Sequence, residues 1–88
     1  MNLPVQVSSC FQGERIHVRG LVQGVGFRPA VWHFAHECGL TGDVLNDGEG
    51  VLIRVWGTSQ QLDKFVSFIT HKAPTLARID SIERILVD

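Results

Sequence analysis

The order in which strand-like and helix-like segments follow one another constrains the fold of this chain more than any other feature. Four segments are predicted as strands: residues 14–22, 40–46, 51–56 and 76–87. In the first of them, Ile16 and Val18 alternate with His17 and Arg19, which is the two-residue period of a strand with one buried face. The pair Asp47-Gly48 predicts a hairpin between the second and third strands.

Two further segments carry the helical spacing of apolar residues. The first has Pro29 in its first turn and Gly39 just after its end, and its apolar face comprises Val31, Phe34, Ala35 and Cys38. The second follows Thr58, which is predicted to form a capping box with Gln61, and it ends before Pro74. The predicted order of elements is therefore βαββαβ.

The simplest fold with this order has two helices packed on one face of a four-stranded antiparallel sheet. This is a split βαβ or ferredoxin-like arrangement of the α+β class. Right-handed crossovers place the first and third strands in the centre of the sheet. The first and second strands then run parallel with the third between them, so that their C-terminal ends lie at one edge, roughly 10 Å apart. We therefore expect the glycine-rich segment after the first strand to lie near Asn46, the last residue of the second.

Length, charge and cysteine content limit the class of protein. The 88 residues suffice for one domain, with residues 1–13 expected as a loose N-terminal leader and residues 14–88 as the folded unit. The net charge of −1 creates no field that recruits nucleic acid or an anionic membrane. Cys10 and Cys38 form no CxxC motif and are interpreted as free thiols in a reducing compartment. Since we find neither a signal peptide nor an apolar run of about 18 residues, the expected location is the cytoplasm.

The glycine-rich segment GLVQGVGFR, residues 20–28, directly precedes the first predicted helix. It contains no proline, so every residue offers a backbone N–H group, and its glycines can adopt φ > 0 and let these groups converge on an anion at the helix N-terminus. Arg28 places a cation where the helix dipole disfavours one, and a phosphate bound between Arg28 and the amides would compensate. A tight strand–helix turn with Arg28 as a solvated surface charge is the alternative, and these residues alone leave both open.

Segment 20–28 resembles the G-x-V-Q-G-V-x-F-R motif of acylphosphatases at every fixed position. The second motif of that family, G-x-V-x-N followed by glycine, is matched by Gly42, Val44, Asn46 and Gly48. The resemblance extends over residues 15–87 and implies the ferredoxin-like fold of the family. Asn46 by itself is also a common turn residue before Asp47-Gly48.

Finer features resemble one branch of this family, the N-terminal domain of HypF, the carbamoyltransferase that matures nickel–iron hydrogenases. They are Phe27-Arg28-Pro29, Gly42-Asp43-Val44 and the segment LARID at residues 76–80. The branch usually has two prolines before that last segment, whereas here Thr75 follows Pro74. Membership of the branch implies that the chain is the N-terminal domain of a larger protein.

The resemblance also implies a function: hydrolysis of acyl phosphates without metal or cofactor, with carbamoyl phosphate as substrate in the HypF setting. It implies that Arg28 and Asn46 are catalytic, Asn46 by orienting the attacking water. The implied phosphate-binding loop comprises Gln23, Gly24, Val25, Gly26, Phe27 and Arg28. Implied partners are a small-molecule acyl phosphate, downstream domains of the same chain and the hydrogenase maturation protein that carries the acceptor cysteine; no nucleic-acid or membrane partner is expected. The alternative is a non-catalytic phosphate-binding or docking module of the same fold.

Overall fold

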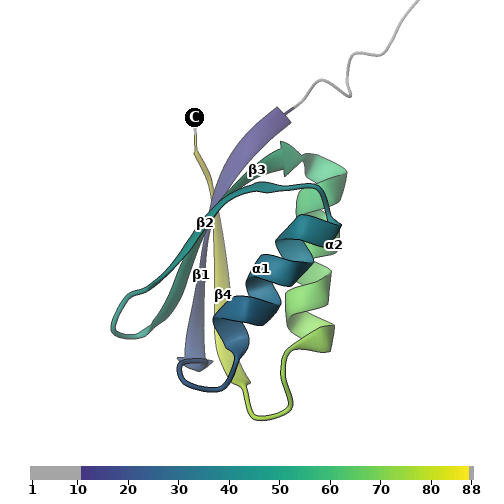
Figure 1. The fold of residues 1–88 in the computed structure, drawn as a ribbon. Helices are drawn as coiled ribbons and strands as arrows, with labels where there is room; N and C mark the ends of the chain where they lie inside the picture. Colours follow the sequence, from purple (N-terminus) through teal and green to yellow (C-terminus); the bar gives the residue numbers. More distant parts are fainter. Residues whose placement is uncertain (1–10, 88) are drawn as a thin grey trace, which may run out of the picture.

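The computed structural model describes residues 11–87, which form a four-stranded antiparallel sheet and two α-helices (Figure 1). The elements follow one another as β1 (Phe11–Leu21), α1 (Phe27–Glu37), β2 (Thr41–Asn46), β3 (Gly50–Thr58), α2 (Ser59–Lys72) and β4 (Arg78–Val87). The predicted βαββαβ order and the ferredoxin-like α+β fold are therefore confirmed.

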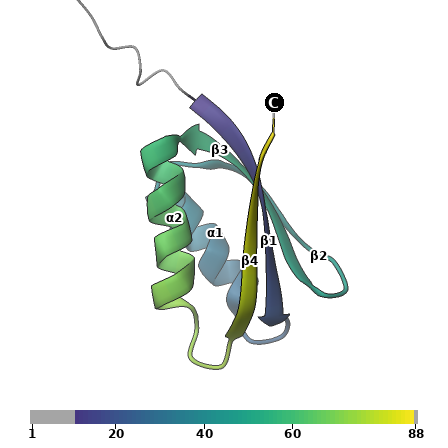
Figure 2. The same cartoon turned by 180° about the vertical axis from the view of Figure 1, so that it is seen from behind.

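The strands lie in the order β2-β3-β1-β4, so that the first and third strands are central as predicted. Both helices cover the same face of the sheet, and no helix of residues 11–87 covers the opposite, open face (Figures 1 and 2). The loop from β1 to α1 and the turn from β2 to β3 lie toward the same end of the molecule (Figures 1 and 2). The sheet order thus brings two segments that are distant in sequence into one region.

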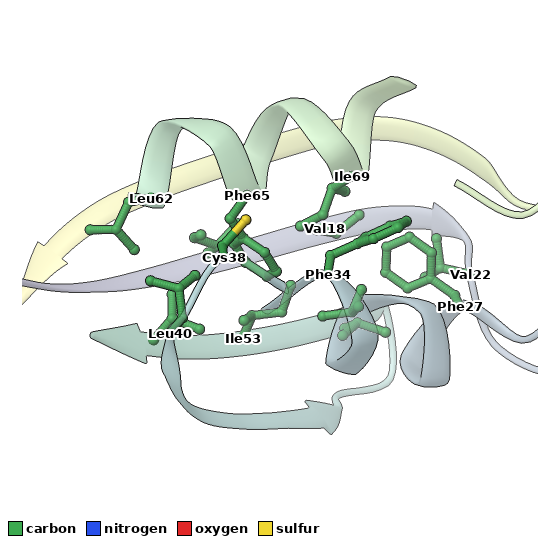
Figure 3. Packing of buried hydrophobic residues seen from close by; sticks show 14 residues of the cluster. Val18, Val22, Phe27, Phe34, Cys38, Leu40, Ile53, Leu62, Phe65 and Ile69 are labelled. Atoms are coloured by element: carbon green, nitrogen blue, oxygen red, sulfur yellow. The ribbon is translucent and has the colours of Figure 1, made fainter. Parts of the chain in front are cut away.

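The core lies between the sheet and the two helices, as Figure 3 shows. Side chains in β1 and β3 alternate between the two faces of the sheet, and the apolar set points toward the helices. Each helix packs one apolar stripe against this set. Burial of each large side chain contributes roughly 1.5–3 kcal/mol of transfer free energy. The fully buried members include Ile16, Val18, Val22, Phe27, Val31, Ile53, Leu62, Phe65 and Ile69.

The predicted helix ends are confirmed. Oγ1 of Thr58 accepts a hydrogen bond of 3.2 Å from the Gln61 backbone, and Oε1 of Gln61 accepts one of 2.8 Å from the Thr58 backbone, which completes the capping box. After α1, Gly39 has φ of 75° and its N–H donates to the carbonyl of His36. Because few residues other than glycine adopt that conformation cheaply, Gly39 ends the helix.

Some strand boundaries differ from prediction. Strand β1 begins at Phe11, so residues 11–13 of the expected leader belong to the sheet, and residues 1–10 lie outside the described residues. The physical reason is that β3 continues to Thr58, which pairs with Phe11 and provides backbone partners for this part of β1. Strand β4 begins at Arg78 rather than at residue 76.

Among residues 11–87, one charged residue is buried. Glu14 is only 5% exposed, and its carboxylate accepts two hydrogen bonds of 2.8 Å from the Arg84 guanidinium. A further bond of 3.0 Å joins Arg84 to Asp63 on α2. These bonds to Glu14 and Asp63 raise the pKa of Arg84. The cluster links β1, β4 and α2.

Of the two cysteines that the sequence predicts to be free thiols, one lies within the described residues. Cys38 is buried and free, and burial raises the pKa of its thiol. Cys10 lies outside the described residues.

Candidate active site

The loop between β1 and α1 depends on two glycines with left-handed backbone conformations. Gly24 has φ of 75° and Gly26 has φ of 81°. A Cβ atom at either position would meet nothing within 4 Å, so it is backbone conformation, not lack of space, that favours glycine there. Phe27 anchors the C-terminal end of the loop, because its ring is fully buried beside Val22 in the core (Figure 3).

Backbone donors in this loop remain unpaired. Within residues 11–87, no N–H group from Gln23 to Arg28 donates a hydrogen bond to another protein group. Gly26 is the N-cap of α1 and provides no side-chain cap, and the first helical turn contains no acidic residue. The positive end of the helix and its free donors therefore face solvent without a protein anion to satisfy them. This is the arrangement that binds an anion.

Arg28 lies in the first turn of α1 and is exposed. Among residues 11–87, no carboxylate lies within 4 Å of its guanidinium, whereas the other arginines except Arg15 each contact one: Arg19, Arg54, Arg78 and Arg84. A cation at a helix N-terminus is disfavoured by the dipole. Arg28 can therefore hold an oxyanion together with the loop amides, in the bidentate manner of a guanidinium.

Asn46 ends β2 at the same end of the sheet. It lies opposite Val51 of β3, and Val51 lies opposite Val18 of β1. Because directly opposite residues project from the same face of a sheet, and Val18 and Val51 are buried beneath the helices, the register assigns Asn46 to the helix-covered face. Its carboxamide therefore lies on the same side of the sheet as α1 and Arg28.

The side chain of Gln23 connects the loop to the Asn46 hairpin. Its Nε2 atom donates a hydrogen bond of 2.9 Å to the carbonyl oxygen of Gly50, which also accepts a bond of 3.1 Å from the Asp47 backbone. Sequence reasoning assigned Gln23 a role through its backbone only. The acylphosphatase motif specifies glutamine at this position, whereas a backbone donor requires no particular side chain. This requirement could have indicated a role for the side chain of Gln23.

A second contact holds the turn from the open face of the sheet. Nε2 of His17 lies 2.8 Å from Oδ2 of Asp47. Burial raises the pKa of Asp47, but the contact with His17 and the backbone N–H groups of Glu49 and Gly50 lower it, and the net shift is downward. The carboxylate that follows Asn46 thus stays ionised and fixed to β1.

No cluster of three or more potential metal ligands occurs within residues 11–87. The two histidines of α1 have separate neighbours: Nε2 of His33 lies 3.5 Å from Glu37, while the ring of His36 stacks on Trp32. Neither helix of the described part is long and apolar enough to cross a membrane.

Comparison with known proteins identifies similar chains. The family model for acylphosphatase matches residues 14–86. The carbamoyltransferase HypF of Rhodobacter capsulatus is 57% identical over 72 residues, covering 82% of this chain but only 9% of the HypF chain. An acylphosphatase of Mannheimia succiniciproducens is 45% identical, with 75% of this chain and 73% of that protein covered. The chain therefore spans about a tenth of the HypF relative and most of the acylphosphatase.

Solved structures show the same two groups. Full-length HypF in a phosphate- and nucleotide-bound form matches with a TM-score of 0.86 and 37% identity, over 89% of this chain and 10% of that chain. The acylphosphatase of Bacillus subtilis matches with a TM-score of 0.81 and 32% identity, over 86% of this chain and 84% of that chain.

Proposed function

The chain belongs to the acylphosphatase family, and from that premise we propose that it hydrolyses the carboxyl–phosphate bond of acyl phosphates. The observation that carries the proposal is the set of unpaired backbone amides from Gln23 to Arg28, next to an arginine that has no carboxylate partner within residues 11–87. These groups supply positive charge to a phosphoryl group without any contribution from a metal ion.

The reaction needs little covalent chemistry from the protein, because an acyl phosphate is already activated. The loop amides and the Arg28 guanidinium hold the equatorial phosphoryl oxygens and stabilise their charge in the transition state. A water oxygen attacks phosphorus in line, and the bond between phosphorus and the acyl oxygen breaks. The electron pair leaves with the carboxylate, and the proton of the attacking water passes to an oxygen of the substrate phosphate.

Asn46 orients the attacking water in this proposal. Its amide oxygen accepts from the water, while its NH₂ group donates elsewhere, and the side chain adds no negative charge near the phosphate. The assignment is supported by the register, which assigns Asn46 to the same sheet face as α1. Holding a water beside phosphorus mainly reduces the entropic part of the barrier.

Carbamoyl phosphate is the substrate that we propose, because HypF relatives are named carbamoyltransferases and one is 57% identical over 72 residues. In that setting the domain would release carbamate for activation by downstream domains of the same chain, in the cytoplasm. The final acceptor would be the cysteine of a partner hydrogenase maturation protein.

Phosphate release tests the proposed hydrolysis. We expect the purified chain to release inorganic phosphate from carbamoyl, acetyl and benzoyl phosphate at rates that EDTA does not change. Saturable binding of phosphate with no release from any of the three substrates would contradict hydrolysis and select the non-catalytic binding module. Loss of activity in EDTA, restored by a divalent metal, would contradict the metal-free mechanism.

A further inference from the structure

A groove of about 90 Å³ runs between α1 and β2 on the helix-covered side of the sheet. Its walls are mainly apolar: Trp32 and Ala35 come from α1, Val44 comes from β2, and Leu40 precedes that strand. Its floor is formed by buried core residues, among them Ile53. The phosphate chemistry described above does not use this groove.

Both walls of the groove belong to elements that also carry candidate site residues, α1 with Arg28 and β2 with Asn46. Trp32 lies four residues after Arg28, one helical turn further along the same stripe of α1, a rise of about 6 Å. Val44 lies two residues before Asn46 and therefore projects from the same face of β2. Trp32 therefore lies about one helical turn from Arg28, within reach of a substituent on a phosphate held there.

Trp32 has the properties of a binding surface. Its side chain is 64% exposed, so it contributes little to the core. The indole stacks on the ring of His36 with centroids 5.4 Å apart and planes 5° from parallel. The indole therefore contributes an aromatic surface to the groove wall.

We propose that the groove binds the acyl substituent of the substrate, with Trp32 as the residue that favours planar apolar acyl groups; this rests on the proposed acyl-phosphate hydrolysis. An aromatic acyl group fills the groove, whereas acetyl and carbamoyl groups are too small to cover the indole.

Steady-state kinetics with benzoyl and acetyl phosphate test this assignment. We expect Trp32→Ala to raise KM for benzoyl phosphate about tenfold, and KM for acetyl phosphate far less, because a lost aromatic contact changes affinity by about that order. Trp32→Phe should restore most of the difference. Trp56→Ala is the matched control, since Trp56 is also partly exposed but projects from the open face of the sheet. Circular dichroism and thermal melting confirm that each variant is folded.

Equal changes for both substrates, an unchanged KM for benzoyl phosphate, or the same selectivity loss in Trp56→Ala would overturn the assignment. Calorimetric binding of benzoylphosphonate and acetylphosphonate separates it from the proposed hydrolysis, because these analogues lack the scissile P–O bond. If the chain shows no turnover, weaker binding of benzoylphosphonate but not of acetylphosphonate by Trp32→Ala still supports the proposed acyl site. Equal binding of benzoylphosphonate by Trp32→Ala and by the unsubstituted chain overturns it.

Discussion

The side-chain amide of Gln23 donates a hydrogen bond of 2.9 Å to the carbonyl oxygen of Gly50, 27 positions later in the sequence. The same carbonyl accepts the backbone N–H of Asp47, the residue after Asn46. One acceptor therefore links the loop that offers unpaired amides to the hairpin that carries Asn46. The sheet order brings the two halves of the candidate site together, and this link joins them directly.

Replacing Gln23 with alanine should loosen the loop relative to the hairpin. We expect KM for acetyl phosphate to rise about fivefold to tenfold, because a lost hydrogen bond of this kind is worth about 1 kcal/mol. Gln60→Ala is a suitable control, since Gln60 is exposed on α2, away from the loop. Unchanged kinetics in Gln23→Ala would show that the loop keeps its shape without this bond.

Replacing Arg28 with alanine should abolish measurable hydrolysis while leaving the fold intact. A guanidinium that holds a transition-state phosphoryl group typically accounts for a factor of 10³ or more in rate. Arg28→Lys keeps the charge but not the bidentate geometry, so we expect only a small recovery. The melting temperature of Arg28→Ala should equal or slightly exceed that of the natural chain, because a cation is removed from a helix N-terminus.

Arg15→Ala provides the matched control for Arg28. Arg15 is also exposed and without a carboxylate partner among residues 11–87, but it lies on the open face of the sheet. If Arg15→Ala lowered kcat/KM as much as Arg28→Ala, general electrostatic attraction would account for the effect and the specific role of Arg28 would be wrong.

Replacing Asn46 with alanine should lower kcat about 100-fold and leave KM nearly unchanged, because the interaction with the water matters mainly in the transition state. Asn46→Asp should also raise KM, since a carboxylate repels the phosphoryl group. Initial-rate kinetics with acetyl phosphate separate kcat from KM. Full activity in Asn46→Ala would eliminate the water-orienting role.

The Glu14–Arg84 pair should dominate the electrostatic contribution to stability. Arg84→Met leaves the Glu14 carboxylate buried without its partner, and we expect the free energy of unfolding to fall by about 2–3 kcal/mol, below the full range for buried pairs because Arg84 is 34% exposed. Urea denaturation measures the change. The exposed pair of Arg78 and Asp80 serves as the control, and Arg78→Met should cost less than about 1 kcal/mol. Equal losses in the two variants would contradict the burial argument.

Features that depend on near neighbours were predictable from the sequence. The capping box at Thr58 and Gln61 involves residues three positions apart, and Gly39 ends α1 by its own backbone conformation. The strand order followed from the handedness of crossovers, and with it came the placement of Asn46 near the glycine loop. The start of β1 was predicted three residues late, because its pairing with Thr58 is not visible in local periodicity.

By itself, the sequence determined the order of elements, the apolar face of each and the glycine positions where the β1–α1 loop turns, because these depend on side-chain period and backbone φ. Only the tertiary structure decided that Gln23 bonds to Gly50, that Arg84 neutralises Glu14 across 70 positions, and that Trp32 faces a groove rather than the core. Such contacts depend on strand register and on how the helices sit on the sheet. Strand register and helix placement are set by the packing of the whole core, and no single segment of the sequence determines that packing.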